Sequence, residues 1–348
     1  IHTEAAHASS EIADVTQLQS DTGETSNSSP ASSTMSNTSE NPIQSKQTDS
    51  SVSQNRLNNG VKLAALSATT KTGELQHSAL SEVSGMTAAL KTPGVLFAIN
   101  DSGNSPVLYA FSEQGNHKGS WTINAQNRDW EDMSSMWLDG KAYLVIGDTG
   151  DNLKAHRYST LYFIEEPTPE IKTNAILSPA IIRQFVFEDG PRNVEAFGVI
   201  DESIYLISKE PVTAAGPSAS RIYQLPLRKQ ISDEQQLATY VGTLPMVQIT
   251  FESRLAAALA GVDLNHITAL EFDAKNNSAY LLTYRHVLRV KRLANQSWVD
   301  AFSAPGVRIH SHNLEQAEAL AVSSGRAVWI SSENRPAPLW AIPIQPLL

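Results

Sequence analysis

The feature of this sequence that most constrains its fold is a repeated pair of short strand-like segments. The second segment of each pair is an apolar run followed by a polar or charged residue. These end positions are Asp101, Asp148, Lys209, Arg285 and Glu333. They recur about every 50 to 75 residues, and short strands that repeat at such a period are typical of β-propeller blades.

The first segment of each pair also carries a recurring residue, which is small or acidic and precedes a small or apolar pair. This position is occupied by Ser84, Glu131, Glu195, Thr268 and Glu318. A third apolar segment follows each pair, so we predict an all-β fold, a β-propeller of four-stranded blades. The repeats give five blades, and the long interval between Lys209 and Arg285 leaves room for a sixth around residues 240–251.

The last repeat ends near Ile344 without a fourth strand. We predict that a strand within residues 62–80 completes this sheet and closes the ring, which would remove exposed strand edges. The propeller domain would then span residues 60–348.

Residues 1–59 differ from the rest because they are rich in Ser, Thr, Asn and Gln, with seven acidic residues and two basic ones. Such a segment cannot bury enough apolar surface to offset its ordering entropy. We predict a disordered tether. The first residue is Ile and not Met, which we interpret as the mature form of an exported protein, periplasmic or extracellular, with lipid attachment of the tail as one option. A chain start chosen for other reasons would look the same.

The net charge of −10 argues against nucleic acid and anionic membranes as partners. The chain has no cysteine, which excludes disulfides and thiolate chemistry. It has no apolar run long enough for a transmembrane helix. We expect a monomer that binds a small anionic ligand, or a protein or glycan outside the cytoplasm.

The innermost strand of each propeller blade lines the central channel, so the first recurring position should form a ring of side chains. Three carboxylates and two hydroxyls would then converge, and calcium prefers such oxygen ligands in loose geometry. This predicts a calcium site formed by Glu131, Glu195 and Glu318, with Ser84, Thr268 or water as further ligands. The alternative is that these acids pair with Arg128, Arg192, Lys209 or Arg285.

The strand-end residues would lie together at one mouth of the channel, where loops on a rigid scaffold commonly bind ligands. We therefore predict ligand contacts from Asp101, Asp148, Lys209, Arg285 and Glu333. Trp130 lies between two acids near this mouth and could stack on a ligand. The alternative for the Asp- and Asn-containing loops is that they are tight turns whose side chains cap their own backbone.

Several motifs together resemble a family of exported bacterial β-propeller proteins without an assigned reaction. They are SGM at 84–86, NRDWEDM at 127–133, YLVIGDTGDN at 143–152, RNVEAF at 192–197, ITALEF at 267–272 and EQAEAL at 315–320. The resemblance extends over residues 81–343 and implies a propeller. In outline the chain is also similar to calcium-dependent propeller hydrolases, the soluble calcium-activated nucleotidases and the propeller phytases. This second similarity implies calcium held by carboxylates of the innermost strands.

Two functions follow from these predictions. The first is a calcium-stabilised propeller that binds a ligand or partner. The second is a calcium-dependent hydrolase of phosphoesters, lactones or glycosides, in which Asp132 or Glu131 acts as general base. No Gly-x-Ser-x-Gly elbow is present, which excludes an α/β-hydrolase.

Overall fold

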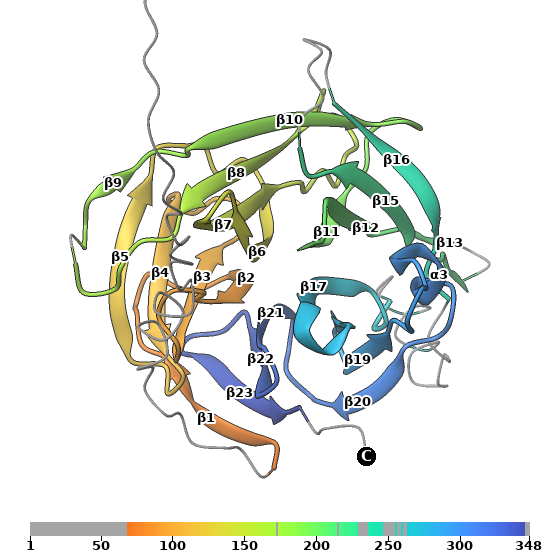
Figure 1. Ribbon diagram of the computed structural model, residues 1–348. Helices are drawn as coiled ribbons and strands as arrows, with labels where there is room; N and C mark the ends of the chain where they lie inside the picture. The colour runs from red at the N-terminus through yellow and green to blue at the C-terminus, as the bar shows by residue number, and fades with distance from the viewer. Residues whose placement is uncertain are drawn as a thin grey trace, which may run out of the picture. The chain divides into compact units, whose positions relative to one another are not determined.

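A computed structural model describes residues 68–171, 173–213, 216–228, 236–245, 255, 259 and 263–344. The predicted tether at residues 1–59 lies outside these ranges. The described chain is nearly all β-strand and forms a β-propeller of five blades, as predicted (Figure 1). Among the described residues, no helix is long and apolar enough to cross a membrane.

Each blade is a sheet of four antiparallel strands, which follow one another from the channel outward. Blade 1 contains β2 (Val83–Ala88), β3 (Val95–Asn100), β4 (Val107–Ser112) and β5 (His117–Ile123). Blade 2 contains β6 (Trp130–Leu138), β7 (Lys141–Asp148), β8 (Ser159–Glu165) and β10 (Ile181–Phe187). Blade 3 contains β11 (Val194–Ile200), β12 (Ser203–Ser208), β15 (Arg221–Pro226) and β16 (Gln236–Thr243).

The last two blades complete the ring. Blade 4 contains β17 (Ile267–Asp273), β18 (Ser278–Thr283), β19 (His286–Lys291) and β20 (Val307–Ser311). Blade 5 contains β21 (Ala317–Ser323), β22 (Ala327–Ser332), β23 (Ala337–Pro343) and β1 (Thr70–Leu75). The remaining elements are β9 (Ile176–Leu177), β13 (Val212–Thr213), β14 (Gly216–Pro217), the 3-10 helix η1 (Ala274–Asn276) and helix α3 (Trp298–Phe302).

The ring closes through β1, which comes from the N-terminal side of the propeller and pairs antiparallel with β23. This confirms the predicted closing strand. Leu75 at the end of β1 is buried, and the backbone N–H of Gln76 donates to the carbonyl of Gly115 in blade 1 at 2.9 Å. One short strand therefore ties the last blade to the first.

The core consists of five apolar clusters, one between each pair of neighbouring blades. The two innermost strands of a blade are buried on both faces, which explains why they appear in the sequence as continuous apolar runs. Trp121 and Trp130 fill the space between blades 1 and 2, and Trp329 lies between blades 5 and 1. Each such side chain stabilises the ring by about 2 to 3 kcal/mol.

Blades 2 and 3 are joined further at their outer edges, because β10 pairs in parallel with β16. Buried Arg183 on β10 strengthens this junction through bonds to the carbonyl of Pro226 at 2.7 Å and to Gln236 Oε1 at 2.8 Å. Tyr240, where a sixth blade was expected to begin, belongs to β16 of blade 3. Residues 246–254 lie outside the described ranges, so the described blades number five.

Candidate functional site

The five innermost strands share a local irregularity at the recurring position. In each strand the pairing register shifts around one extra residue, a β-bulge. The extra residues are Ser84, Glu131, Glu195, Thr268 and Glu318. A bulge leaves its residue unpaired and re-aims the side chain. Because the bulge recurs at the same point in every blade, the five side chains lie at one end of the channel, near the ends of the second strands.

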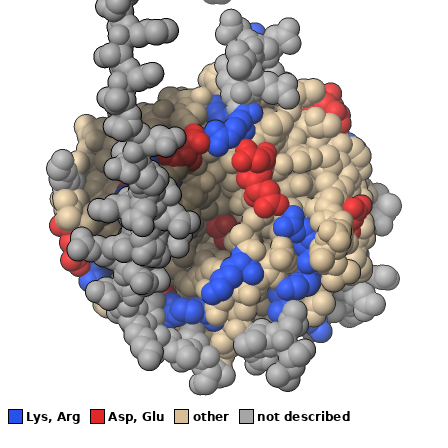
Figure 2. Space-filling view, viewed as in Figure 1, with Lys and Arg blue, Asp and Glu red and all other residues tan. Residues whose placement is uncertain are grey.

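Three carboxylates come together at this end, which we call the acidic mouth. Oxygen atoms of Asp101, Asp129 and Glu131 lie within 4.8 Å of one another. Asp101 follows β3 in blade 1, Asp129 precedes β6, and Glu131 is the bulged residue of β6. No described residue forms an ion pair with any of the three. Figure 2, viewed along the same direction as Figure 1, shows charged side chains around a central hollow in the ring.

The position of Asp129 is fixed by the loop after β7. Its backbone N–H donates to Asp148 Oδ1 at 2.9 Å, and its carbonyl accepts from the N–H groups of Thr149 and Gly150, each at 3.2 Å. Arg128 lies 3.5 Å from the same Asp148 oxygen. The strand-end acid Asp148 therefore orients Asp129, and the role in ligand binding predicted for Asp148 stays a prediction.

Gly150 makes the close approach of these carboxylates to the loop possible. A Cβ at this position would lie 2.2 Å from Glu131 Oε1 and 2.3 Å from Asp129 Oδ2. A side chain at this position would displace both carboxylates, which explains the second glycine of the GDTGDN motif.

Ser84 is the neighbour of Glu131 in the ring, on blade 1. Strands β2 and β6 approach so closely at this point that a Cβ on Gly85 would lie 2.8 Å from the backbone nitrogen of Met133. The Ser84 side chain is fully buried, and its Oγ has no hydrogen-bond partner in the described part of the chain. A buried hydroxyl without a partner is costly and calls for an explanation such as a bound ion.

The other side of the mouth is held together by a chain of polar contacts. Lys209 Nζ pairs with Glu195 Oε1 at 2.9 Å and lies 3.5 Å from the Tyr284 hydroxyl. That hydroxyl donates to Glu318 Oε1 at 3.2 Å. Burial, followed by repulsion from Glu195 and Glu333, raises the pKa of Glu318 well above its usual range.

The electrostatics of the mouth reflect an excess of negative charge. Burial raises the pKa of Asp101 to about 6, and nearby Asp129, Glu333 and Glu195 add to the effect. Burial, followed by repulsion from Glu195, raises the pKa of Glu131 well above its usual range. Burial alone would lower the pKa of Lys209, but the adjacent Glu195 outweighs it and raises the pKa. The charge of Lys209 thus offsets that of Glu195, and the negative charge of the group around Asp101 is not offset by an ion pair with a described residue.

The predicted calcium ligands lie at one end of the channel, but they contact different groups there. Glu131 faces Asp101 and Asp129, whereas Glu195 is paired with Lys209, in agreement with the salt-bridge alternative at that position. Thr268 Oγ1 donates to the carbonyl of Ala317 in the next blade at 2.7 Å. The group of three suited to a cation is therefore Asp101, Asp129 and Glu131. Asp129 was missing from the predicted ligands because it lies outside the repeated positions.

Trp130 and Arg285 were both predicted to contact a ligand. Trp130 cannot stack on a ligand, because its side chain is fully buried between blades 1 and 2 and its Nε1 donates to the carbonyl of Gln126 at 3.0 Å. This corrects the prediction, and the reason is the bulge, which turns Glu131 to the channel and Trp130 to the core. Arg285 is half-buried at the end of blade 4 and forms no ion pair with a described residue, so its ligand role stays a prediction.

Asp132 belongs to a second, deeper group of polar residues. Its buried carboxylate accepts from the backbone N–H groups of Met133, Phe197 and Leu270 at 2.8, 3.0 and 3.2 Å, which ties blades 2, 3 and 4 together. Burial raises its pKa well above the usual range, and these three donors oppose the shift. The hydrogen bonds favour a structural role, so catalysis by Asp132 stays a prediction without a contact to support it.

Glu271 on β17 completes the deeper group. Its carboxylate accepts from Thr87 Oγ1 of blade 1 and Ser134 Oγ of blade 2, both at 2.9 Å. Blades 1 and 2 are not neighbours of blade 4 in the ring, so these bonds cross the channel axis and fill it. Burial raises the pKa of Glu271 to about 7. The acidic mouth is therefore closed below by side chains.

No protein-family model matches this chain, and none of the curated proteins compared with it matches. Similar solved structures include the PQQ-bound aldose sugar dehydrogenase of Streptomyces coelicolor, at 8% identity over 81% of this chain and 100% of that chain, with a TM-score of 0.39. A glucose dehydrogenase is 9% identical over 80% and 99% of the two chains, with a TM-score of 0.43. A Trichoderma reesei carbohydrate-active enzyme of family AA12 is 8% identical over 74% and 79%, with a TM-score of 0.41. With identities this low and TM-scores below 0.5, the likeness is limited to coarse architecture. Fold and site together define the chain as a five-bladed β-propeller with an acidic channel mouth.

Proposed function

We propose that this chain is an exported β-propeller that holds a calcium ion at its acidic mouth and binds an anionic ligand there. The observation that supports it is the group of three carboxylates, Asp101, Asp129 and Glu131, with no cationic partner among the described residues. Three carboxylates without a counter-charge repel one another, and a bound cation relieves the repulsion. The site is open only at the mouth, because Glu271 and its hydrogen-bond partners lie across the channel below it.

The donor set fits calcium. Carboxylate and hydroxyl oxygens are the ligands of a hard cation, and calcium accepts them in irregular arrangements. The buried Ser84 Oγ next to Glu131 would supply a fourth oxygen and gain the partner it lacks. A calcium ion with an open coordination position would bind an anionic oxygen directly, and Arg285, which forms no ion pair with a described residue, is the cation at this end of the channel that would meet the rest of the anion. Export rests on the sequence alone and remains part of the proposal.

The alternative is a calcium-dependent hydrolase of phosphoesters, lactones or glycosides, with Glu131 or Asp132 as general base. The raised pKa of Glu131 is compatible with proton transfer near neutral pH. The carboxylate oxygens of Asp132, however, already accept hydrogen bonds from three backbone N–H groups. We therefore give binding precedence over hydrolysis.

The variant Gly150→Ala tests the cation site without altering the core. The new methyl group would collide with carboxylate ends that can rotate away, so we expect the fold to survive while Glu131 and Asp129 are displaced. For the unmodified chain we expect calcium at about 100 times its dissociation constant to raise the melting temperature by about 5 to 10 °C over EDTA. Gly150→Ala should lose most of that rise.

The control is Gly140→Ala, at the hairpin between β6 and β7, where an added Cβ meets nothing within 4 Å. It should lower the melting temperature slightly and keep the full calcium-dependent rise. If Gly150→Ala also keeps the full rise, the ion binds elsewhere. If the unmodified chain shows no rise, the cation part of the proposal is wrong.

Calcium affinity should fall with acidity. Ligand carboxylates must lose their protons to bind a metal. The pKa of Asp101 is raised to about 6, and that of Glu131 is raised well above its usual range. Protons therefore compete with calcium at pH 6, and affinity should fall severalfold from pH 8 to pH 6. Titration calorimetry at the two pH values measures this, and equal affinities would mean that other groups bind the ion.

A further inference from the structure

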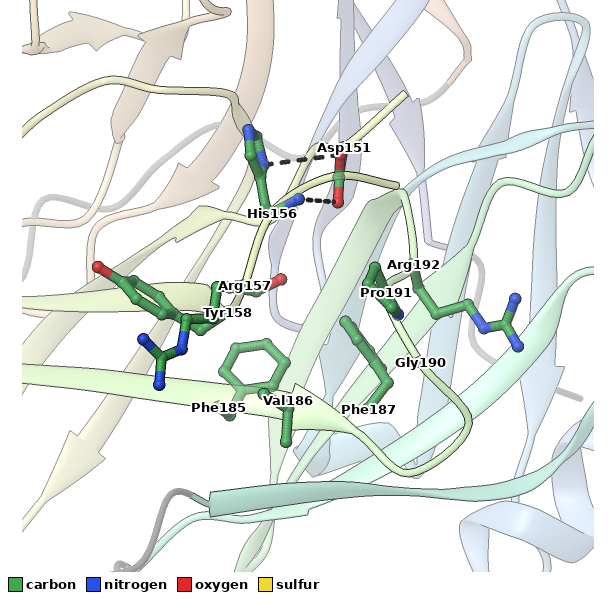
Figure 3. Close-up of a pocket in the computed structure, with 11 residues that line it drawn as sticks. Asp151, His156, Arg157, Tyr158, Phe185, Val186, Phe187, Gly190, Pro191 and Arg192 are labelled. Carbon is green, nitrogen blue, oxygen red and sulfur yellow. Dashed lines mark hydrogen bonds and ion pairs between the residues drawn. The ribbon is translucent and has the colours of Figure 1, made fainter. Parts of the chain in front are cut away.

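A cavity of about 160 Å³ lies beside the acidic mouth, between the loop after β7 and the outer strand β10 of blade 2 (Figure 3). Its walls come from three segments, which are part of the loop 151–159, residues 185–187 of β10 and the turn 190–192 that leads toward blade 3. Neither the calcium site nor the alternative hydrolase uses this cavity.

One wall of the cavity is apolar and aromatic. Phe185 and Phe187 alternate along β10 and therefore face the same side of the strand, with their rings edge to face at 5.4 Å. Phe187 packs in turn against Tyr223 at 4.9 Å. Figure 3 shows these two phenylalanines on the side of the cavity opposite His156 and Asp151. Both phenylalanine side chains belong to the core between blades 2 and 3, so they form a rigid floor, of which only Phe187 keeps a small exposed area.

The opposite wall is polar, and most of its groups are already bonded. The Asp151 carboxylate accepts from the backbone N–H groups of Ala155 and His156 at 2.8 and 2.9 Å. His156 Nδ1 lies 3.1 Å from the carbonyl of Gly150. A carbonyl only accepts, so Nδ1 carries the proton, and Nε2 of the neutral ring is an acceptor that does not bind an anion.

The two arginines at the cavity differ. Arg192 is committed to Asp189 at 2.6 Å and to the Tyr223 hydroxyl at 2.7 Å, and in Figure 3 its guanidinium points away from the cavity. Arg157 is exposed and forms no ion pair with a residue that the structure describes. The rim therefore carries one cation that is free to meet an anion.

We propose that this cavity is a binding site for a single aromatic ring that carries an anionic substituent. An apolar protein cavity of about 150 Å³ is known to accept benzene, so the volume suits one ring. The ring would lie against Phe187 and the turn 190–192, and the anion would meet Arg157. This site shares the loop 149–158 with the acidic mouth but does not depend on calcium.

Benzoate is the probe, and the full chain is titrated in EDTA so that the result is separate from the cation proposal. Changes in backbone amide NMR signals locate the site. We expect the changes to cluster at residues 156–159 and 185–187. Benzyl alcohol and benzylamine, which keep the ring without the negative charge, should bind at least threefold more weakly.

Two variants sharpen the test. Arg157→Gln should weaken benzoate about three- to fivefold and leave benzyl alcohol unchanged. Lys154→Asn is the matched control, since it removes the same charge from the same loop at a residue with positive φ that Asn tolerates, and it should bind as the unmodified chain does. Signal changes elsewhere, no saturable changes, or benzylamine binding as tightly as benzoate would overturn the proposal.

Discussion

Gly115→Ala is expected to destabilise the propeller by about 3 kcal/mol or more, because it attacks the closure of the ring. Gly115 has a φ of +82°, a conformation that disfavours a side chain. A Cβ there would also lie 2.0 Å from the carbonyl oxygen of Glu74 in β1. That oxygen belongs to the backbone and cannot rotate away, so β1 must shift from blade 1 and expose Leu75. The melting temperature should fall by about 6 to 12 °C.

Gly140→Ala separates the effect of backbone strain from the effect of the collision with β1. Gly140 has a similar φ of +77° but open space around it, so the variant should cost about 1 kcal/mol from backbone strain alone. The excess loss in Gly115→Ala measures the contact between β1 and blade 1. If both variants lose the same stability, closure through β1 contributes little.

Glu271→Gln is expected to stabilise the propeller above pH 7 and to have little effect near pH 4.5. Burial raises the pKa of Glu271 from its usual 4.5 to about 7. The unfolded chain releases this proton at lower pH than the folded chain, so the folded state loses stability as the pH rises from 4.5 to 7. The full penalty, about 3 kcal/mol, is present above pH 7. Glutamine has no charge to bury. Its Oε1 can accept from Ser134, and its Nε2 can donate to the Thr87 hydroxyl, which then donates to Ser135.

The comparison needs denaturant unfolding at pH 4.5 and pH 8.5, with Glu165→Gln as control. Glu165 forms an exposed ion pair with Lys141, so its loss should change stability by less than about 1 kcal/mol at either pH. A loss of stability in Glu271→Gln at pH 8.5 would show that the hydrogen bonds to the carboxylate outweigh its burial.

The blade architecture could be predicted because each blade repeats the same burial pattern. Strands β3, β7, β12, β18 and β22 are apolar on both faces and end at a polar residue, and this pattern is visible without coordinates. The closing strand β1 was predicted by counting, since blade 5 lacked a fourth strand. The sixth blade was suggested by the long interval before Arg285. The length of an interval does not show which strands pair, and Tyr240 belongs to blade 3.

The site was predicted in outline and missed in detail because of the bulges. A regular strand would place Glu131 and its neighbours on alternating faces. The bulge instead turns Glu131 to the mouth, Trp130 to the core and Asp132 to the backbone of two other blades. Asp129 was not predicted to be a ligand because it precedes β6, and its place depends on Asp148 far along the chain. Glu271 was missed because it resembles any polar strand residue until the ring brings Thr87 and Ser134 to it.

Calcium binding by Asp101, Asp129 and Glu131 can be measured by calorimetric titration of calcium into the metal-free chain at pH 8, compared with Glu131→Gln. We predict saturable binding of one calcium ion per chain and at least a tenfold loss of affinity in the variant. An absence of binding in the unmodified chain, or equal binding in Glu131→Gln, would contradict the proposed calcium site.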